Sequence, residues 1–187
     1  MYGGDTINLM EEAQWTIRDF HQGDLPACQK LYVEGLLGGK LAENDTALDL
    51  DDIESVYMKT SGNHFWVAET SDGRIVGMIG VQHHEQGVGE VRRLRVAQDL
   101  RRRGIGKALL EKAITFCKEN QYLKVALDTF AERVVVVEMF QKLGFVHGST
   151  RHHAGKDLLY FYMDLYSGPP RAHKEDRVGG HAGDGHG

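Results

Sequence analysis

The spacing of apolar residues between positions 15 and 165 alternates between every second residue and every third or fourth. A period of two is typical of strands, and a period near 3.6 is typical of amphipathic helices. The pattern predicts strands over 15–20, 64–70, 74–84, 90–96, 122–130, 145–150 and 158–165. It predicts helices within 21–37, near 48–60, from 105 onward and over 131–144. This order of elements favours a mixed α/β fold of the α+β kind, with helices flanking one sheet.

Local signals support several of these boundaries. Asp24 followed by Pro26 is typical of a helix start, and the sequence SDG before the strand 74–84 predicts a hairpin. The run Val134–Val137 is β-branched and would favour a strand by propensity alone. Gly144 is a typical helix stop, however, and a helix is therefore predicted over 131–144. The apolar residues of the helix after 105 share one face: Ile105, Ala108, Leu109, Ala113, Phe116 and Cys117.

Composition sets the scale of the protein. A chain of 187 residues that is 41% apolar and 26% charged suffices for one core, and a single domain is expected over 13–166. Residues 1–12 and the Gly- and His-rich tail 167–187 lack apolar periodicity and are expected to be disordered. The tail histidines match no zinc spacing, so no metal is expected.

Other features indicate the compartment. The two cysteines, Cys28 and Cys117, lie in apolar helical patterns and are interpreted as core thiols. The sequence contains no apolar run long enough for a membrane span and no charged-then-apolar leader. A cytoplasmic location without a membrane partner is therefore expected.

The formal net charge of −5 argues against a general nucleic-acid coat, because such binding depends on accumulated Lys and Arg. Nevertheless, the stretch RRRGIGKALL places three arginines and two glycines directly where a helix begins. A helix N-terminus exposes unpaired N–H groups and attracts anions, and Gly104 and Gly106 remove side chains that would block that backbone. The stretch predicts a site for a pyrophosphate, with a tight turn and a solvated basic rim as the alternative.

Two common phosphate motifs fail on spacing. A P-loop requires Ser or Thr after its lysine, whereas Ala108 follows Lys107. A dinucleotide-binding fingerprint requires a third glycine where this chain has Leu109. What remains is Arg-x-x-Gly-x-Gly, which follows the strand segment LRV after a short interval.

That motif carries a resemblance. The segment GEVRRLRVAQDLRRRGIGKALLEKAITFC resembles the acetyl-coenzyme-A-binding core of the GCN5-related N-acetyltransferase (GNAT) superfamily, and MFQKLGF resembles its second signature. The order of strands and helices is similar from Trp15 to Leu165. The resemblance implies a mostly antiparallel sheet in which parallel strands 4 and 5 splay apart, with helices on its faces. It also implies transfer of an acetyl group from acetyl-CoA to a primary amine in a ternary complex.

The resemblance implies a cofactor site made largely of main chain. The pantetheine arm would lie along Leu94, Arg95 and Val96, and the pyrophosphate would lie on the loop before the helix. Arg133 takes the place of an asparagine that touches the cofactor in many members. The residues expected at the loop are Arg101, Arg102, Arg103, Gly104, Ile105, Gly106 and Lys107.

The chemistry requires that the amine lose a proton and that the thioester oxygen be stabilised. Glu90 stands where the histone-modifying branch of the family has a general base, with a solvated carboxylate as the alternative. His83 and His84 are competing bases, of which one must face away because strand side chains alternate. The Val96 N–H is the expected oxyanion donor.

This chain departs from the family at the leaving group. Phe140 stands where many members have a tyrosine acid, so either no acid is used or Tyr160 or Tyr162 substitutes for it. Releasing a free thiolate at pH 7 costs only about 2 kcal/mol, given a thiol pKa of about 8.5.

The acceptor is weakly encoded. The acidic residues Glu43, Asp45, Asp49, Asp51, Asp52 and Glu54 would suit a cationic amine or peptide, although they are also typical of a helix start. Arg151 would suit an acceptor carboxylate instead. A non-catalytic acyl-CoA-binding module and a nucleic-acid strip over 91–103 are the rival interpretations; the strip lacks interleaved aromatic residues, and no nucleic acid is expected. A homodimer is expected by analogy with the fold.

Overall fold

The computed structural model describes residues 14–36, 46–84, 87–153 and 155–166. The expected disordered segments 1–12 and 167–187 lie outside these ranges, and the domain limits stay a prediction. The strands are β1 (Trp15–Asp19), β2 (His64–Thr70), β3 (Ile75–His84), β4 (Val88–Val96), β5 (Lys124–Phe130), β6 (Val146–His153) and β7 (Lys156–Asp164). The α-helices are α1 (Leu25–Glu34), α2 (Ile105–Glu119) and α3 (Val134–Lys142).

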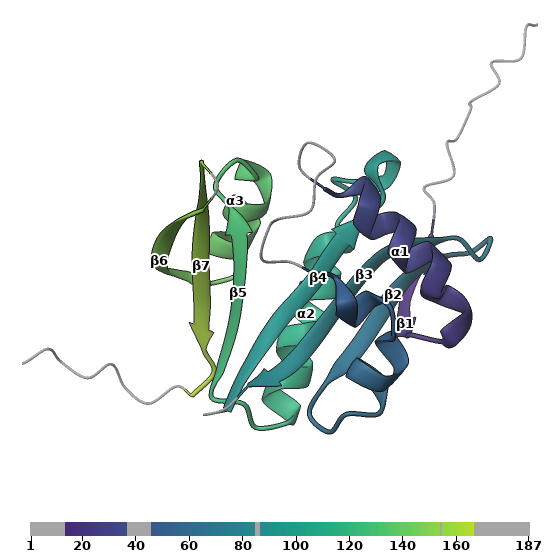
Figure 1. Cartoon of the computed structure of the whole chain (residues 1–187), viewed down its shortest axis with the longest axis horizontal. Helices are drawn as coiled ribbons and strands as arrows, with labels where there is room; N and C mark the ends of the chain where they lie inside the picture. The colour runs from purple at the N-terminus through teal and green to yellow at the C-terminus, as the bar shows by residue number, and fades with distance from the viewer. Residues whose placement is uncertain (1–13, 37–45, 85–86, 154, 167–187) are drawn as a thin grey trace, which may run out of the picture.

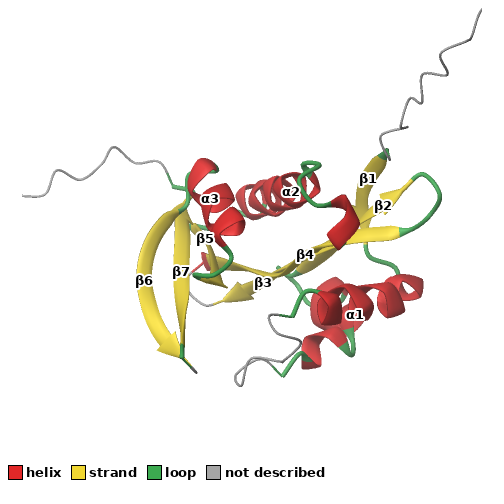
Figure 2. Cartoon of the chain, turned by 90° about the horizontal axis from the view of Figure 1, so that it is seen from above, coloured by secondary structure: helices red, strands yellow, loops and turns green. Residues whose placement is uncertain are grey.

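The strands form one sheet of seven in the order β1-β2-β3-β4-β5-β7-β6. Every neighbouring pair is antiparallel except β4 and β5, which are parallel. Helix α1 covers one face of the sheet, and α2 and α3 cover the other (Figure 2). Figure 1 shows β4 and β5 meeting at one end and diverging toward the other. The predicted mostly antiparallel sheet, with splayed parallel strands 4 and 5, is therefore confirmed.

The continuous helix expected near 48–60 is wrong. The chain forms a 3₁₀ turn at Leu48–Leu50 and a single π-helical turn at Glu54–Met58. Tyr57 is fully buried, its ring lies 5.0 Å from that of Phe65, and its hydroxyl donates to Asp49 Oδ2 at 2.6 Å. These tertiary contacts decide the local conformation, as they often do where intrinsic propensity is weak.

The helix predicted through the valine run is confirmed, although it is shorter than the predicted range and covers Val134–Lys142. Gly144 ends it with φ of 94° and donates its N–H to the Gln141 carbonyl at 3.0 Å. A positive φ is inexpensive only for glycine, so the stop signal outweighs the β propensity of the valines.

Both cysteines lie in the core, as expected. Cys28 and Cys117 are fully buried and unbonded to one another. Burial raises the pKa of the Cys117 thiol to about 12 and does the same for Cys28. Within the described residues, no helix has both the length and the apolar character needed to cross a membrane.

Candidate active site

The loop before α2 leaves its backbone open. Gly104 precedes the helix with φ of 83°, no side chain caps the helix, and its first turn contains no acidic residue. A Cβ on Gly104 would meet nothing within 4 Å, and one on Gly106 would come no closer than 3.5 Å to Val96 Cγ2. Uncapped N–H groups at a helix start attract anions, and the open backbone lets a ligand approach them.

The charged side chains of this loop stay available to a ligand. Arg101, Arg102 and Arg103 are exposed, and Arg101 Nε donates to the Val96 carbonyl at 3.3 Å. The neighbouring acid Asp99 is bonded by both terminal nitrogens of Arg74, at 2.7 and 2.9 Å, and this pairing lowers its pKa. Asp99 is thus paired mainly with Arg74, and it interacts with Arg103 of the loop only through the weaker charge–charge attraction.

The two remaining expected loop residues differ in what they can offer a ligand. The Ile105 side chain is buried in the core, so only its N–H can face a ligand. Lys107 is exposed and lies 3.6 Å from Glu111 across one helical turn. These positions keep the predicted role of the loop consistent with backbone recognition.

The two parallel strands separate after three residue pairs. Val88, Gly89 and Glu90 pair with Lys124, Val125 and Ala126, and no further pair follows between the described residues of these strands. A bulge bends β4 just beyond the fork, because Arg93 and Leu94 lie between the pairs that flank the single residue Ile79 of β3. Arg93 adopts φ of 59° there. The resulting gap is lined by β4, β5 and the start of α3.

Main-chain groups of β4 face this gap. The Ala97 N–H donates to the Val76 carbonyl of β3 at 2.8 Å. Successive N–H groups of a strand point to opposite edges, so the Val96 N–H is directed away from β3 and toward the gap. The Leu94 carbonyl accepts a hydrogen bond from Arg95 Nη1 at 2.9 Å. A pantetheine arm that paired with this carbonyl would displace Arg95.

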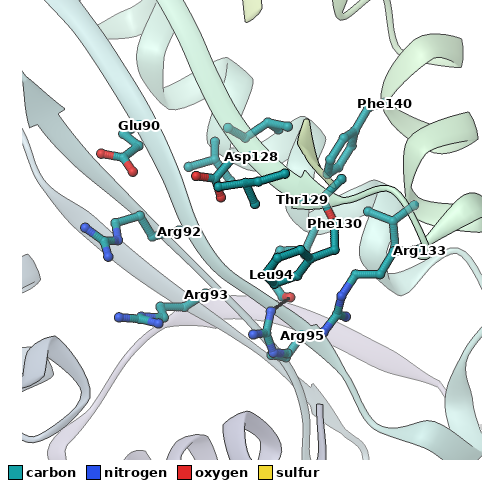
Figure 3. A pocket seen from close by; sticks show the side chains of 14 residues that line it. Glu90, Arg92, Arg93, Leu94, Arg95, Asp128, Thr129, Phe130, Arg133 and Phe140 are labelled. Carbon is teal, nitrogen blue, oxygen red and sulfur yellow. Dashed lines mark hydrogen bonds between the residues drawn. The ribbon is translucent and has the colours of Figure 1, made fainter. Parts of the chain in front are cut away.

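Glu90 lies at the fork. Its side chain is 31% exposed, and its Oε2 contacts Nε2 of His84 at the end of β3. His83 faces the other way and stacks on Tyr122, with ring centroids 5.2 Å apart. Asp128 of β5 lies across the gap from Glu90 (Figure 3). The fork thus holds one carboxylate from each wall.

Four arginines also line the gap: Arg92, Arg93, Arg95 and Arg133 (Figure 3). Arg93 is buried, and its Nε donates to Asp49 Oδ2 at 2.8 Å. Arg133 Nη2 donates to the Gly35 carbonyl at the end of α1, at 2.6 Å, and burial lowers its pKa. Arg92 Nη1 donates to Gln82 at 3.3 Å, beyond the usual hydrogen-bond distance.

Phe140 lines the gap, whereas neither acid candidate, Tyr160 or Tyr162, is among its lining residues. Phe140 is buried against Phe145 and Phe161, which accounts for its apolar side chain. Tyr160 pairs with Asp128 in the ladder between β5 and β7, one strand removed from β4, and is not among the residues that line the gap. Its role as an acid stays a prediction. The Lys124 ammonium lies over the Tyr162 ring, 4.5 Å from its centroid.

The acidic residues expected to attract a cationic acceptor do not assemble at the gap. Asp49 is turned inward by Arg93, and its pKa falls because hydrogen bonds from Arg93 and Tyr57 outweigh the effect of burial. Asp52 accepts the Ser55 N–H at 3.0 Å, and Glu54 pairs with Lys59 at 2.8 Å. Glu43 and Asp45 lie outside the described residues.

Sequence reasoning missed three features of the site. Arg92 and Asp128 line the pocket just beyond the three parallel pairs of β4 and β5, and the Gly35 carbonyl accepts a hydrogen bond from one lining residue, Arg133. The only local signal was the arginine-rich strand itself. Arg151, expected at an acceptor wall, is exposed on β6 and does not line the gap. Burial of Arg93 also breaks up the basic strip that a nucleic-acid interface would need.

Comparison with known proteins agrees with this geometry. A model of the acetyltransferase (GNAT) family matches residues 25–145. N-acetylaspartate synthetases of Xenopus tropicalis and Homo sapiens are each 38% identical over 107 residues, which is 56% of this chain and 39% and 35% of those proteins. Human N-acetyltransferase 8 is 33% identical over 102 residues, 52% of this chain and 44% of that protein. The chain thus spans less than half the length of these relatives.

Solved structures share the fold. An acetyltransferase of the GNAT family from Staphylococcus aureus has a TM-score of 0.71 and 22% identity, covering 82% of this chain and all of that one. A putative acetyltransferase from Salmonella typhimurium, solved with its cofactor acetyl-CoA, has a TM-score of 0.69 and 18% identity, covering 83% and 96%. On the extent of the family match, this chain belongs to the acetyltransferase (GNAT) family.

Proposed function

We propose that this protein transfers the acetyl group of acetyl-CoA to the primary amine of a small acceptor that carries carboxylates, an acidic amino acid of the aspartate kind. Two observations carry the proposal: the pocket between β4 and β5 is lined by Glu90 and four arginines, and the uncapped start of α2 lies beside β4, where Gly106 approaches Val96. The names of the N-acetylaspartate synthetase relatives support the acceptor class.

Acetyl-CoA fits the residues present. Its pyrophosphate would lie on the open backbone of Gly104 and Gly106, with Arg101–Arg103 beside it. The pantetheine would pair with Leu94 and Val96, whose main chain faces the gap. Bound there, the thioester supplies an activated acetyl carbonyl. Arg133 reaches the same gap from the start of α3 and is a further candidate contact.

The residues of the chain would supply the remaining chemistry. The Glu90 carboxylate at the fork accepts a proton from the acceptor ammonium, so that the neutral amine can attack the carbonyl carbon. The Val96 N–H stabilises the oxygen that becomes negative. The carbon–sulfur bond then breaks, the thiolate leaves with the electron pair, and the nitrogen of the new amide releases its remaining extra proton to solvent. Phe140 offers no proton to the thiolate, which is consistent with departure of the free thiolate.

Charge favours an acidic acceptor over a polyamine. Arg92 lies on the same side of β4 as Glu90, two residues along the strand, where its guanidinium can meet an acceptor carboxylate. A cationic acceptor would have to approach this arginine and its three neighbours in the gap. Arg92 is therefore the residue expected to select the acceptor.

Thiol release with acetyl-CoA tests the proposal. L-aspartate, L-asparagine and spermidine would each be supplied as acceptor, and products would be identified by mass. We expect turnover in that order of preference, and Arg92→Gln should lower kcat/KM for L-aspartate by about 10- to 100-fold, the effect of one charged hydrogen bond. Arg151→Gln, an exposed arginine away from the gap, is the matched control.

Three outcomes count against parts of the proposal. Tight acetyl-CoA binding without thiol release for any amine would favour the non-catalytic acyl-CoA-binding module. Preference for spermidine would overturn the acceptor class while keeping the reaction. Equal losses in Arg92→Gln and Arg151→Gln would remove Arg92 from acceptor recognition.

A further inference from the structure

The pairing of β3 with β4 brings one particular histidine to Glu90. Gln82 lies directly opposite Glu90 and His84 opposite Val88, so His84 is the diagonal neighbour of Glu90 on the same face. His84 Nε2 contacts Glu90 Oε2. His83 belongs to the opposite face, where it stacks on Tyr122. Strand alternation therefore assigns His84, and not His83, to this carboxylate.

The contact constrains both groups. A carboxylate only accepts hydrogen bonds, so the ring nitrogen that contacts it must carry the hydrogen. A hydrogen bond at this contact would hold the His84 ring with a hydrogen on Nε2 and would hold one oxygen of Glu90 in return. Oε1 is then the oxygen left to accept a proton from an acceptor ammonium. The His84 and Glu90 side chains are 53% and 31% exposed, so both groups are accessible to solvent.

Without this contact, Glu90 has a competing partner. Arg92 follows two residues later on the same face of β4, and its guanidinium makes a long contact to Gln82, at 3.3 Å. An ion pair between Glu90 and Arg92 would draw the carboxylate away from the fork. It would also engage the guanidinium that is expected to bind the acceptor. Holding Oε2 at His84 keeps both side chains available to a substrate.

We propose that His84 is a positioning residue for catalysis, which donates its Nε2–H to Glu90 Oε2 and holds that carboxylate at the fork and apart from Arg92. The inference rests on the proposed function, because it takes Glu90 as the base. It assigns no proton-transfer step to His84 itself.

Two amide substitutions separate this role from simple packing. In His84→Gln the amide nitrogen can reach the place of Nε2, whereas in His84→Asn it reaches only as far as Nδ1. With acetyl-CoA and L-aspartate, we expect kcat to fall about tenfold in His84→Asn, the effect of one lost hydrogen bond to a charged group, while KM for acetyl-CoA is unchanged. His84→Gln should recover to within about threefold of the parent protein, by the same reasoning. His83→Gln is the matched control and should leave kcat unchanged. Equal kcat in the two His84 variants would overturn the proposal.

A spectroscopic measurement tests the contact independently of activity. Nitrogen-15 NMR of the His84 ring reports which nitrogen carries the hydrogen. We expect the Nε2–H tautomer to predominate in the parent protein and to lose population in Glu90→Met, which has no acceptor. If acetyl transfer is absent from the parent protein, the proposed function fails, and this spectrum still decides the pairing. Identical tautomer populations in the two proteins would overturn it.

Discussion

Two Arg–Asp pairs of similar geometry and different burial allow a sharp test of what holds β4 in place. The Arg93 and Asp49 side chains are 5% and 12% exposed, and both oxygens of Asp49 contact the guanidinium. Arg74 and Asp99 also form a bidentate pair, through the two terminal nitrogens of Arg74, at 51% and 58% exposure. We compare Asp49→Asn with Asp99→Asn, which remove the same charge from each pair.

The expected losses of stability differ several-fold. Asn at position 49 removes the Asp49 charge from the Arg93 guanidinium, which lies buried over the Tyr32 ring, 5.1 Å from its centroid. Breaking a buried pair in this way costs about 3–5 kcal/mol of unfolding free energy. The exposed pair is screened by water, so Asp99→Asn should cost about 0–1 kcal/mol. Urea unfolding at pH 7, with midpoints and slopes for all three proteins, measures both values.

The pH dependence provides a second check on the same pair. The folded-state pKa of Asp49 is lowered, so the carboxylate stabilises the protein above its unfolded pKa of about 3.9. That contribution is lost as pH falls through the lower folded pKa. The difference in stability between the parent and Asp49→Asn should therefore narrow below about pH 4. Equal losses for the two variants at pH 7 would refute the argument from burial.

Two further predictions concern the cofactor loop and the thiols. Gly106→Ala places its Cβ in ordinary contact with Val96 and Met139, so the free energy of unfolding should stay level or rise by up to about 1 kcal/mol. The affinity for acetyl-CoA, measured by calorimetry, should fall at least about tenfold because the methyl group covers the loop backbone. Unchanged affinity would show that the pyrophosphate binds elsewhere. Burial raises the pKa of Cys117 to about 12, as it does for Cys28. A thiol reagent at pH 8 should therefore label neither cysteine in the native protein and both cysteines in denaturant. Rapid labelling of the native protein would contradict the buried placement.

Features that depend only on residues adjacent in the sequence could be predicted from it. The glycine loop, the stop at Gly144 and the start of α1 near Asp24 all depend on local backbone chemistry, and they lie where the pattern indicated. The turns at 48–60 could not be predicted, because Asp49 contacts β4 and Tyr57 contacts β2, and the local sequence does not reveal these tertiary contacts.

The bulge in β4 was the main obstacle to predicting the site. Strict alternation in EVRRLRV would give Arg93 the face opposite to Arg92 and continue that rhythm to Val96. The extra residue at the bulge interrupts this alternation. Arg93 turns inward to Asp49, and β4 diverges from β5. A bulge of this kind depends on the partner strand, so one strand's sequence does not reveal it.

The distribution of ion pairs accounts for a basic site in a chain of net charge −5. Several acids in the described part of the chain are matched by arginines away from the loop: Arg18 holds Asp24 at 2.7 Å and Glu69 at 2.8 Å, and Arg74 holds Asp99. The side chains of Arg101–Arg103 remain exposed to solvent although the whole chain is acidic. Because attraction between exposed charges decays over about 10 Å at 0.1 M salt, this local excess decides what the loop binds, and the net charge does not.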